Sequence, residues 1–346
     1  RRGDRQAGSE QARNKSVPHA IPRSRFGSAV LGGGVALGVD VILNRNARGL
    51  GDSRADRRTL AATAQRQGAR VHETRTAEDL HRVAEAVANR GADAVVLVGG
   101  DGSCMMGLSA LAHAFGDRPI PRIAFAPAGT VCTIARNLGT RTGAGAERLL
   151  RAVCNGTARA TSQSTLRVRD DAGSERVGFI FGAGLVSHFF GVYDASSRGL
   201  GAAASIAARV FAGSFVGSAL ARRVLDPVAC TITVDGSKHS ARAWSLVVAS
   251  VLRDVGLHCL VTYRAGEEQE RFHVVASGVP PSALGPQMPR VLAGRPLRGE
   301  PRVDTLAASL RIEFDQDSGG YVLDGEVMRA RWASVQLGPT LSVLVA

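Results

Sequence analysis

Between residues 36 and 154, short apolar runs alternate with segments whose apolar positions recur at helical spacing. The runs at 36–43, 69–74, 94–98 and 123–126 have the length and composition of buried strands. The segments at 52–67, 77–89, 105–114 and 131–137 repeat apolar residues three or four positions apart, as a helix packed on one face does. This alternation predicts a parallel sheet with helices on its faces.

The period changes after residue 160. Strand-like segments separated by turn residues follow at 165–169, 176–181, 231–234, 244–251, 258–263, 271–276, 311–314 and 321–323. The proline-rich stretch 280–301 is expected to be a loop. The predicted fold class is therefore an α/β N-terminal domain with a parallel sheet, followed by a mostly antiparallel β-sandwich domain.

Charge divides the chain further. The 346 residues carry a net charge of +13, and residues 1–25 hold seven basic and two acidic side chains without an apolar period. We therefore expect a basic, disordered tail at 1–35, an α/β domain at 36–160 and a β-rich domain at 161–337. Because no aromatic residues interleave with these charges, nucleic acid is not an expected partner.

Two residue counts narrow the chemistry. Lys15 and Lys238 are the only lysines, so the chain contains neither a G-x-x-x-x-G-K-[ST] phosphate loop nor the strand lysine of a protein kinase. The five cysteines form no C-x-x-C pair and are odd in number, which favours reduced thiols and a cytoplasmic location.

The strongest local motif is Gly99-Gly100-Asp101-Gly102-Ser103, between a predicted buried strand and a helix. Glycines let a ligand approach the backbone, and the helix start offers N–H groups to phosphate oxygens. Asp101 is expected in a solvent-facing turn, where a carboxylate beside phosphates has reason to hold a cation, a hydroxyl or a proton. The alternative is a plain glycine turn whose aspartate caps the helix.

A second turn, Pro127-Ala128-Gly129-Thr130, follows the next strand. Both turns would lie at strand carboxyl ends on one edge of the sheet, where open α/β sheets bind ligands. Alone, this turn is equally well explained by Thr130 capping a helix. Near the C-terminus, Asp324-Gly325-Glu326 follows a strand and could aim one carboxylate at a hydroxyl, although an isolated D-G-E is usually a hairpin turn.

Together these segments resemble the diacylglycerol kinase catalytic-domain superfamily, which includes bacterial lipid kinases and sphingosine kinases. The resemblance starts near residue 38 and covers nearly the whole chain after it. It rests on the order and spacing of the loop 44–49, Thr74, the G-G-D-G-S motif at 99–103, the P-x-G-T motif at 127–130 and the D-G-E at 324–326.

The resemblance implies a two-domain kinase that transfers the γ-phosphoryl group of ATP to the hydroxyl of a diacylglycerol-like or sphingoid lipid. It implies Glu326 as proton acceptor, helped by Asp324 or Asp101, with Mg²⁺ and with a C-terminal strand at 338–346 that returns to the first domain. The implied nucleotide contacts are Asn44, Thr74, Gly99, Gly100, Asp101, Gly102, Ser103, Gly129 and Thr130.

Two departures keep alternatives open. The family commonly has a side-chain amide after Gly129-Thr130, whereas this chain has Val131-Cys132-Thr133. The family's magnesium-binding Asp-Gly-Leu segment is matched at best by 254–257, which makes Asp254 the candidate metal ligand. Two alternative functions therefore stay open: a catalytically weak or inactive lipid-binding or regulatory homologue, and another G-G-D-G kinase such as NAD kinase. The oligomeric state also stays open, with a homodimer as a candidate.

The segment 195–225 combines small and apolar residues with four arginines and no acidic residue. This composition is typical of a helix that lies on an anionic membrane surface without spanning it. A helix buried between the domains and a membrane span are the alternatives. The chain is thus expected in the cytoplasm, in peripheral contact with a membrane.

Overall fold

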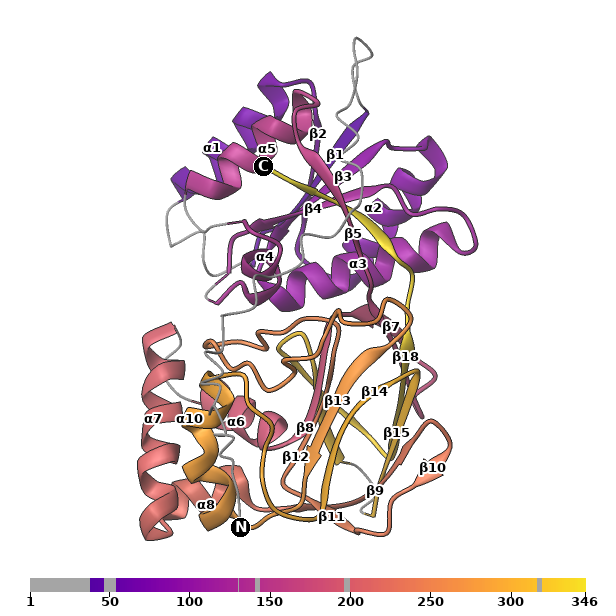
Figure 1. Ribbon diagram of the computed structural model, residues 1–346. Helices are drawn as coiled ribbons and strands as arrows, with labels where there is room; N and C mark the ends of the chain where they lie inside the picture. The colour runs from indigo at the N-terminus through magenta and orange to yellow at the C-terminus, as the bar shows by residue number, and fades with distance from the viewer. Residues whose placement is uncertain (1–37, 47–53, 130, 141–143, 196–199, 316–318) are drawn as a thin grey trace, which may run out of the picture.

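The computed structural model describes residues 38–46, 54–129, 131–140, 144–195, 200–315 and 319–346. These residues form an α/β part and a β-rich part stacked end to end (Figure 1). The tail expected at residues 1–35 and the predicted nucleotide contact Thr130 lie outside the described residues.

The α/β part contains one six-stranded sheet, the first sheet, with the order β2-β1-β3-β4-β19-β5. Its strands from β2 through β19 pair in parallel, and β5 pairs antiparallel to β19. The strands are β1 (Val39–Asn44), β2 (Arg70–Thr74), β3 (Ala94–Gly99), β4 (Arg122–Pro127), β5 (Arg159–Gln163) and β19 (Leu341–Val345). The predicted parallel sheet is confirmed.

Helices cover both faces of the first sheet, as Figure 1 shows. The helices are α1 (Arg54–Arg66), α2 (Ala77–Arg90), α3 (Asp101–Phe115), α4 (Thr133–Asn137) and α5 (Ala144–Cys154). Leu60 of α1 and Leu149 of α5 pack with Val41 and Val96 on one face. Residues of α2 and α3 pack on the other face, where Thr76 and Asp79 form a capping box that starts α2.

The β-rich part contains two antiparallel sheets, which confirms the predicted second domain class. The second sheet has the order β10-β9-β15-β18-β6-β7, with β11 beside β9, and the third has the order β14-β13-β12-β8-β16-β17. The second sheet comprises β6 (Leu166–Asp170), β7 (Glu175–Gly178), β9 (Val228–Val234), β10 (Ser237–Lys238), β11 (Ala243–Trp244), β15 (Ser309–Phe314) and β18 (Trp332–Leu337). The third comprises β8 (Ile180–Gly184), β12 (Leu246–Ser250), β13 (Phe272–Ser277), β14 (Arg302–Ala307), β16 (Gly319–Leu323) and β17 (Glu326–Ala330).

One apolar core joins the two parts of the molecule. Side chains from the second and third sheets, such as Ile232 and Phe272, belong to the same buried cluster as Leu108 of α3. At this junction Ser109 of α3 donates a hydrogen bond to the Val177 carbonyl and accepts one from the Val177 amide. Helix α3 is therefore fixed against both the first sheet and strand β7.

A helical layer lies beside the third sheet (Figure 1). It consists of α6 (Leu185–Asp194), α7 (Leu200–Val216), α8 (Ala219–Leu225), α9 (Pro281–Leu284), the 3-10 turn η2 (Gly285–Gln287) and α10 (Met288–Leu292). The loop predicted at 280–301 is thus partly helical, because its prolines stand in the first turns of these short helices, where a missing N–H costs nothing. The strand predicted at 258–263 is wrong, since turns occupy those residues.

Within the described residues, no single helix has the length and apolar character needed to cross a membrane. The bent pair Gly201–Val216 and Ala219–Leu225, with 105° between its two helices, meets the length and composition criteria only when taken together.

Candidate active site

The two predicted glycine turns lie against each other at the carboxyl edge of the first sheet. Gly99 and Pro127 are partners in the ladder between β3 and β4, and the Ala128 amide donates a 2.8 Å hydrogen bond to the Gly99 carbonyl. A Cβ on Gly129 would stand 2.3 Å from the Cα of Gly100, so only glycine fits where the two backbones cross. The turns therefore form one surface of backbone.

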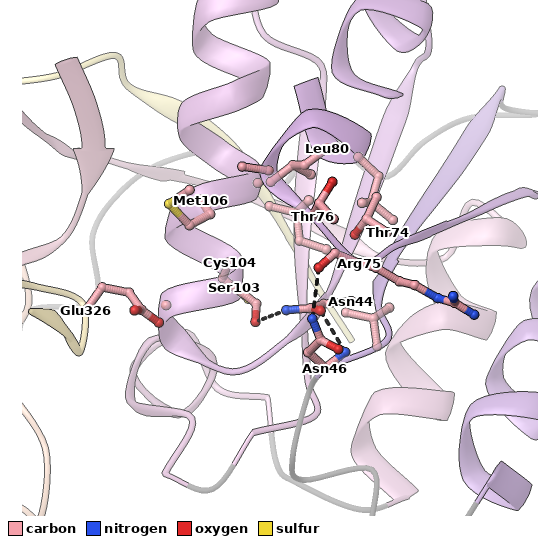
Figure 2. A pocket seen from close by; sticks show the side chains of 16 residues that line it. Asn44, Asn46, Thr74, Arg75, Thr76, Leu80, Ser103, Cys104, Met106 and Glu326 are labelled. Carbon is pink, nitrogen blue, oxygen red and sulfur yellow. Dashed lines mark hydrogen bonds between the residues drawn. The ribbon is translucent and has the colours of Figure 1, made fainter. Parts of the chain in front are cut away.

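A polar network joins this surface to the ends of β1 and β2 (Figure 2). The Asn44 amide donates a 2.7 Å hydrogen bond to the Ser103 hydroxyl, and Asn44 Oδ1 accepts one from the Asn46 backbone amide. Asn46 in turn donates to the Arg75 carbonyl, and Thr74 is the ladder partner of Asn44. The structure thus brings Asn44, Thr74 and Ser103 together as the sequence predicted.

These groups line a first pocket of about 240 Å³. Its walls come from the ends of β1 and β2, the first turn of α2 and the first turns of α3, and Glu326 closes one side (Figure 2). Asn46, Arg75 and Thr76 belong to the pocket but were missed by sequence reasoning. The loop 44–49 was a signal for Asn46, whereas Thr76 reads from sequence only as a helix cap.

Asp101 is half-buried, not fully exposed as expected. Its two carboxylate oxygens accept hydrogen bonds of 2.8 and 2.9 Å from the backbone amides of Thr133 and Ile134, at the start of α4. Burial raises the pKa of this carboxyl above its ordinary value, although the two amides oppose that shift. The carboxylate thus ties the first turn of α3 to α4, a contact that the expected solvent-facing turn did not include.

Cys132 shapes the same region. Its backbone is left-handed, with φ of 51°, and its Sγ accepts a 3.2 Å hydrogen bond from the Gly129 amide. Burial raises the pKa of this thiol to about 11, so the thiol is neutral and unreactive at physiological pH. One N–H of the second glycine turn is therefore already occupied within the protein.

The D-G-E segment forms the tight turn between β16 and β17, in which Leu323 and Glu326 are ladder partners. Asp324 is buried, and its carboxylate accepts hydrogen bonds from the backbone amides of Phe179 and Ile180. Burial and the nearby Asp101 charge raise the pKa of Asp324 well above its ordinary value. Asp324 thus fixes the turn to the start of β8, and Glu326 is the exposed carboxylate of the turn.

Glu326 crosses from the β-rich part to the first turn of α3. A Cβ added to Gly102 would come within 2.0 Å of Glu326 Oε1, so the carboxylate rests on the backbone of the G-G-D-G-S motif. The sequence could not reveal this contact, because it joins residues more than 220 positions apart.

A second pocket of about 690 Å³ opens on the other side of Glu326. It shares Asn44, Asn46, Gly102, Ser103 and Glu326 with the first pocket. Away from this rim its lining is mostly apolar and comes from the third sheet and the helical layer, including Phe181, Phe189, Val210, Phe211, Val248, Leu284 and Val291. The first pocket, whose lining mixes polar and apolar groups, and the larger, mostly apolar second pocket therefore meet at one carboxylate.

Asp254 is not brought to this rim. Its side chain accepts a hydrogen bond from the Gly256 amide, its carbonyl accepts one from Asn137, and it lines neither pocket. The described part of the chain also contains no group of three or more His, Cys, Asp or Glu side chains able to hold a metal. A Mg²⁺ that nucleotide phosphates largely hold needs only one or two protein carboxylates. The carboxylates near this rim therefore fit such an ion.

Comparisons with known proteins agree with this arrangement. Residues 39–165 match the family model of the diacylglycerol kinase catalytic domain, whereas a comparison with curated proteins gives no match. A putative diacylglycerol kinase structure from Bacillus anthracis str. Sterne is 15% identical, with a TM-score of 0.62 over 90% of this chain and 99% of that one. Another structure from that organism, titled a diacylglycerol kinase, is 13% identical, with a TM-score of 0.58 over 89% and 97%. At these identities the likeness to solved structures shows the fold alone: the chain has the two-domain fold of those bacterial proteins, and its residues 39–165 are similar to the diacylglycerol kinase catalytic domain.

Proposed function

We propose that this protein transfers the γ-phosphoryl group of ATP to the hydroxyl group of a lipid. The family match supports a kinase-type phosphotransferase. The observation that carries the lipid assignment is the shared rim, where Gly102, Ser103 and Glu326 belong to both the first pocket and the mostly apolar second pocket. A nucleotide in the first pocket and an apolar chain in the second would bring phosphate and hydroxyl together at Glu326.

The nucleotide side of the reaction relies on the backbone. Helix α3 is 15 residues long, and its N-cap Gly100 receives no side-chain cap, so the N–H groups of its first turn are available to phosphate oxygens. Asn44 and Ser103 hold each other in place at the pocket wall. Because no lysine lines either pocket, the phosphate charge falls to backbone dipoles, to a cation and to Arg75 of the first pocket.

The transfer itself needs one proton acceptor. The lipid hydroxyl oxygen forms a bond to the γ-phosphorus as the bond to the bridging oxygen of ADP breaks, and the hydroxyl proton passes to the Glu326 carboxylate. When bound, Mg²⁺ would neutralise charge on the phosphates, with Asp101, which lines the second pocket, as the protein carboxylate that would help to hold it. Asp324 and Asp101 keep the D-G-E turn and the start of α3 in position by accepting hydrogen bonds from backbone amides.

The lipid side is built for one long apolar group. Besides the rim, the second pocket is lined by Leu284, Met288 and Val291 of the helical layer and by aromatic side chains of α6. Burying apolar surface there contributes about 25 cal/mol per Å². A hydroxyl at one end of an acyl or sphingoid chain could then reach Glu326 with its tail enclosed.

The test is transfer of radiolabel from [γ-³²P]ATP to separate acceptors: diacylglycerol, a sphingoid base, a long-chain monoacylglycerol and NAD. Labelling of at least one lipid but not of NAD is the expected result. Labelling of NAD alone would overturn the lipid assignment in favour of another G-G-D-G kinase.

One observation favours a second candidate, a lipid-binding homologue with weak or no catalysis. The Gly129 amide, which an open phosphate loop would offer to the nucleotide, is bound to Cys132 Sγ. ATP titration by calorimetry separates the two functions. Measurable ATP affinity supports the kinase, whereas lipid binding without ATP binding supports the homologue.

A further inference from the structure

The corner between helices α7 and α8 is a fixed bend. Helix α7 ends at Val216, Gly217 takes a left-handed backbone with φ of 63°, and Ser218 caps α8 by accepting a hydrogen bond from the Ala221 amide. The two helices meet at 105°. Because glycine and the cap determine the bend, the last turn of α7 is held at the outer edge of the helical layer (Figure 1).

Large apolar side chains are exposed at this corner. Phe215 is 62% and Val216 is 80% exposed. Among the large hydrophobic residues in the described ranges, only Leu292 and Val327 are also exposed, and less so, at 42% and 41%. The inner faces of α7 and α8, in contrast, are buried against the third sheet through residues such as Val210 and Val224. The pair is therefore a protein-packed element with an apolar tip.

The apolar tip continues the wall of the second pocket. Phe211, one helical turn before Phe215, lines that pocket, and the two rings meet edge to face with centroids 5.2 Å apart. An apolar path thus leads from the inside of the pocket to the exposed tip.

The charge around the tip is net positive. Arg222 and Arg223 of α8 and Arg209 of α7 are exposed, and neither helix contains an acidic residue. Asp226 follows directly after α8 and is also exposed, so the cluster keeps a net positive charge. Exposed aromatic and aliphatic side chains next to arginines match the two layers of a bilayer surface, with acyl chains below and anionic headgroups above.

We propose that this corner, residues 209–223, docks on an anionic lipid surface, with Phe215 and Val216 inserted among the acyl chains. The proposal rests on the proposed function to the extent that the docked surface would deliver the lipid substrate to the adjoining pocket. The net positive charge and the continuity with the apolar pocket favour a bilayer over a protein partner, for which a rim with balanced charges of both signs would be expected.

Vesicle co-sedimentation of the full chain tests the docking. The vesicles contain phosphatidylcholine alone or with phosphatidylserine, neither of which is an expected substrate. We expect binding that needs phosphatidylserine and weakens from 0.05 to 0.5 M NaCl. The double variant Arg222→Gln/Arg223→Gln should bind about 30-fold less tightly, which corresponds to ~2 kcal/mol for two arginines at the surface. If neither the double variant nor the higher salt concentration weakens binding, the proposal is overturned.

A matched control has the same loss of charge elsewhere. Arg58→Gln/Arg148→Gln removes two exposed arginines from α1 and α5 in the α/β part. This control should bind vesicles within about twofold of the parent. An equal loss in both double variants would mean general attraction by net charge and would contradict a specific corner.

Insertion of the tip has its own readout. In Phe215→Trp the new indole should shift its emission to the blue on anionic vesicles and be quenched by brominated acyl chains, beyond any change of Trp244 and Trp332 in the parent. An unchanged spectrum with bound protein would refute insertion. Self-association of the free protein that Phe215→Ser abolishes would assign the tip to a second copy of this chain, which also refutes the proposal.

The kinase assay separates this inference from the proposed function. Phe215→Ser/Val216→Ser should lower transfer to a lipid presented in vesicles at least tenfold, and should leave transfer to a short-chain, water-soluble lipid unchanged. If the parent phosphorylates no lipid but still binds vesicles through the corner, the proposed function fails and the docking surface stands.

Discussion

At the scale of single residues, Asp101 and Asp324 hold the site together through backbone amides, although both also line the second pocket. Asp101 ties α3 to the first turn of α4, and Asp324 ties the turn between β16 and β17 to strand β8. Both accept hydrogen bonds only from backbone amides in these contacts. Their substitution should therefore change stability as well as activity, which distinguishes them from Glu326.

Asp101→Asn should lower both stability and transfer. The amide keeps one acceptor oxygen but presents an N–H₂ group to the other backbone amide, which leaves one buried donor unpaired. We expect a loss of about 1–3 kcal/mol in the free energy of unfolding and a fall of at least 10²-fold in transfer. Urea unfolding measures the first, with Asp117→Asn just beyond the end of α3 as control. Full stability with lost activity would contradict the role in positioning.

Asp324→Asn should change how stability depends on pH. The pKa of Asp324 is raised in the folded protein, so its contribution to stability is complete below the ordinary value of 3.8. As the pH rises above that value, the unfolded chain releases the proton while the folded protein keeps it, and the free energy of unfolding falls. Asparagine has no such proton, and its oxygen can accept from both the Phe179 and Ile180 amides at the position of Oδ1.

The variant should therefore gain stability relative to the parent between pH 4.5 and 6.5. Urea midpoints at three pH values check this, and a difference that shrinks as the pH rises would show that the folded-state pKa is not raised.

At the scale of elements, the site depends on how closely the start of α3 approaches the turn between β16 and β17. Gly102→Ala places a methyl group where Glu326 Oε1 now lies. Because Glu326 is exposed and can swing away, the helix should keep its stability or gain up to about 1 kcal/mol from the better helix former. Transfer should fall at least tenfold.

Gly191→Ala in α6 is the matched control, because a Cβ there meets nothing within 4 Å. Unfolding curves and initial rates are compared for both variants. Undiminished transfer in Gly102→Ala would mean that the position of Glu326 does not matter.

The sequence predicted these elements unequally. Strands β1, β3 and β4 and helices α2 and α3 followed from apolar period and caps, because local residues determine them. Helices α9 and α10 were missed, since prolines tolerated in a first turn resemble loop residues. The contact of Asp101 with α4 and the contact between Gly102 and Glu326 depend on packing between distant segments, which no local pattern encodes.

At the scale of the whole molecule, the C-terminal strand completes the first sheet. Strand β19 lies between β4 and β5, and its side chains Leu341, Val343 and Leu344 are buried. From sequence, this return rested on family resemblance and on an apolar ending, not on any feature that specifies the pairing. The α/β part thus obtains one of its inner strands from residues that follow the entire β-rich part in the sequence.

Removing residues 341–346 should therefore unfold the α/β part before the β-rich part. Loss of β19 leaves β5 without a partner and removes three aliphatic side chains from the core, at a cost of several kcal/mol. Hydrogen exchange should show lost protection in β4 and β5 and retained protection in β12 and β13. A chain that lacks only Ala346 is the control, and equal protection in both chains would contradict this dependence.

The central claim is that Glu326 accepts the proton of a lipid hydroxyl at the rim between the two pockets. Its most direct test is the turnover of Glu326→Gln with ATP and the lipid that the parent labels best, alongside Glu313→Gln, which changes an exposed carboxylate of β15. The account predicts that Glu326→Gln lowers turnover by about 10²–10⁴ with unchanged ATP affinity, and that the control is unaffected. Turnover within about threefold of the parent, or an equal loss of ATP affinity and turnover, would contradict it.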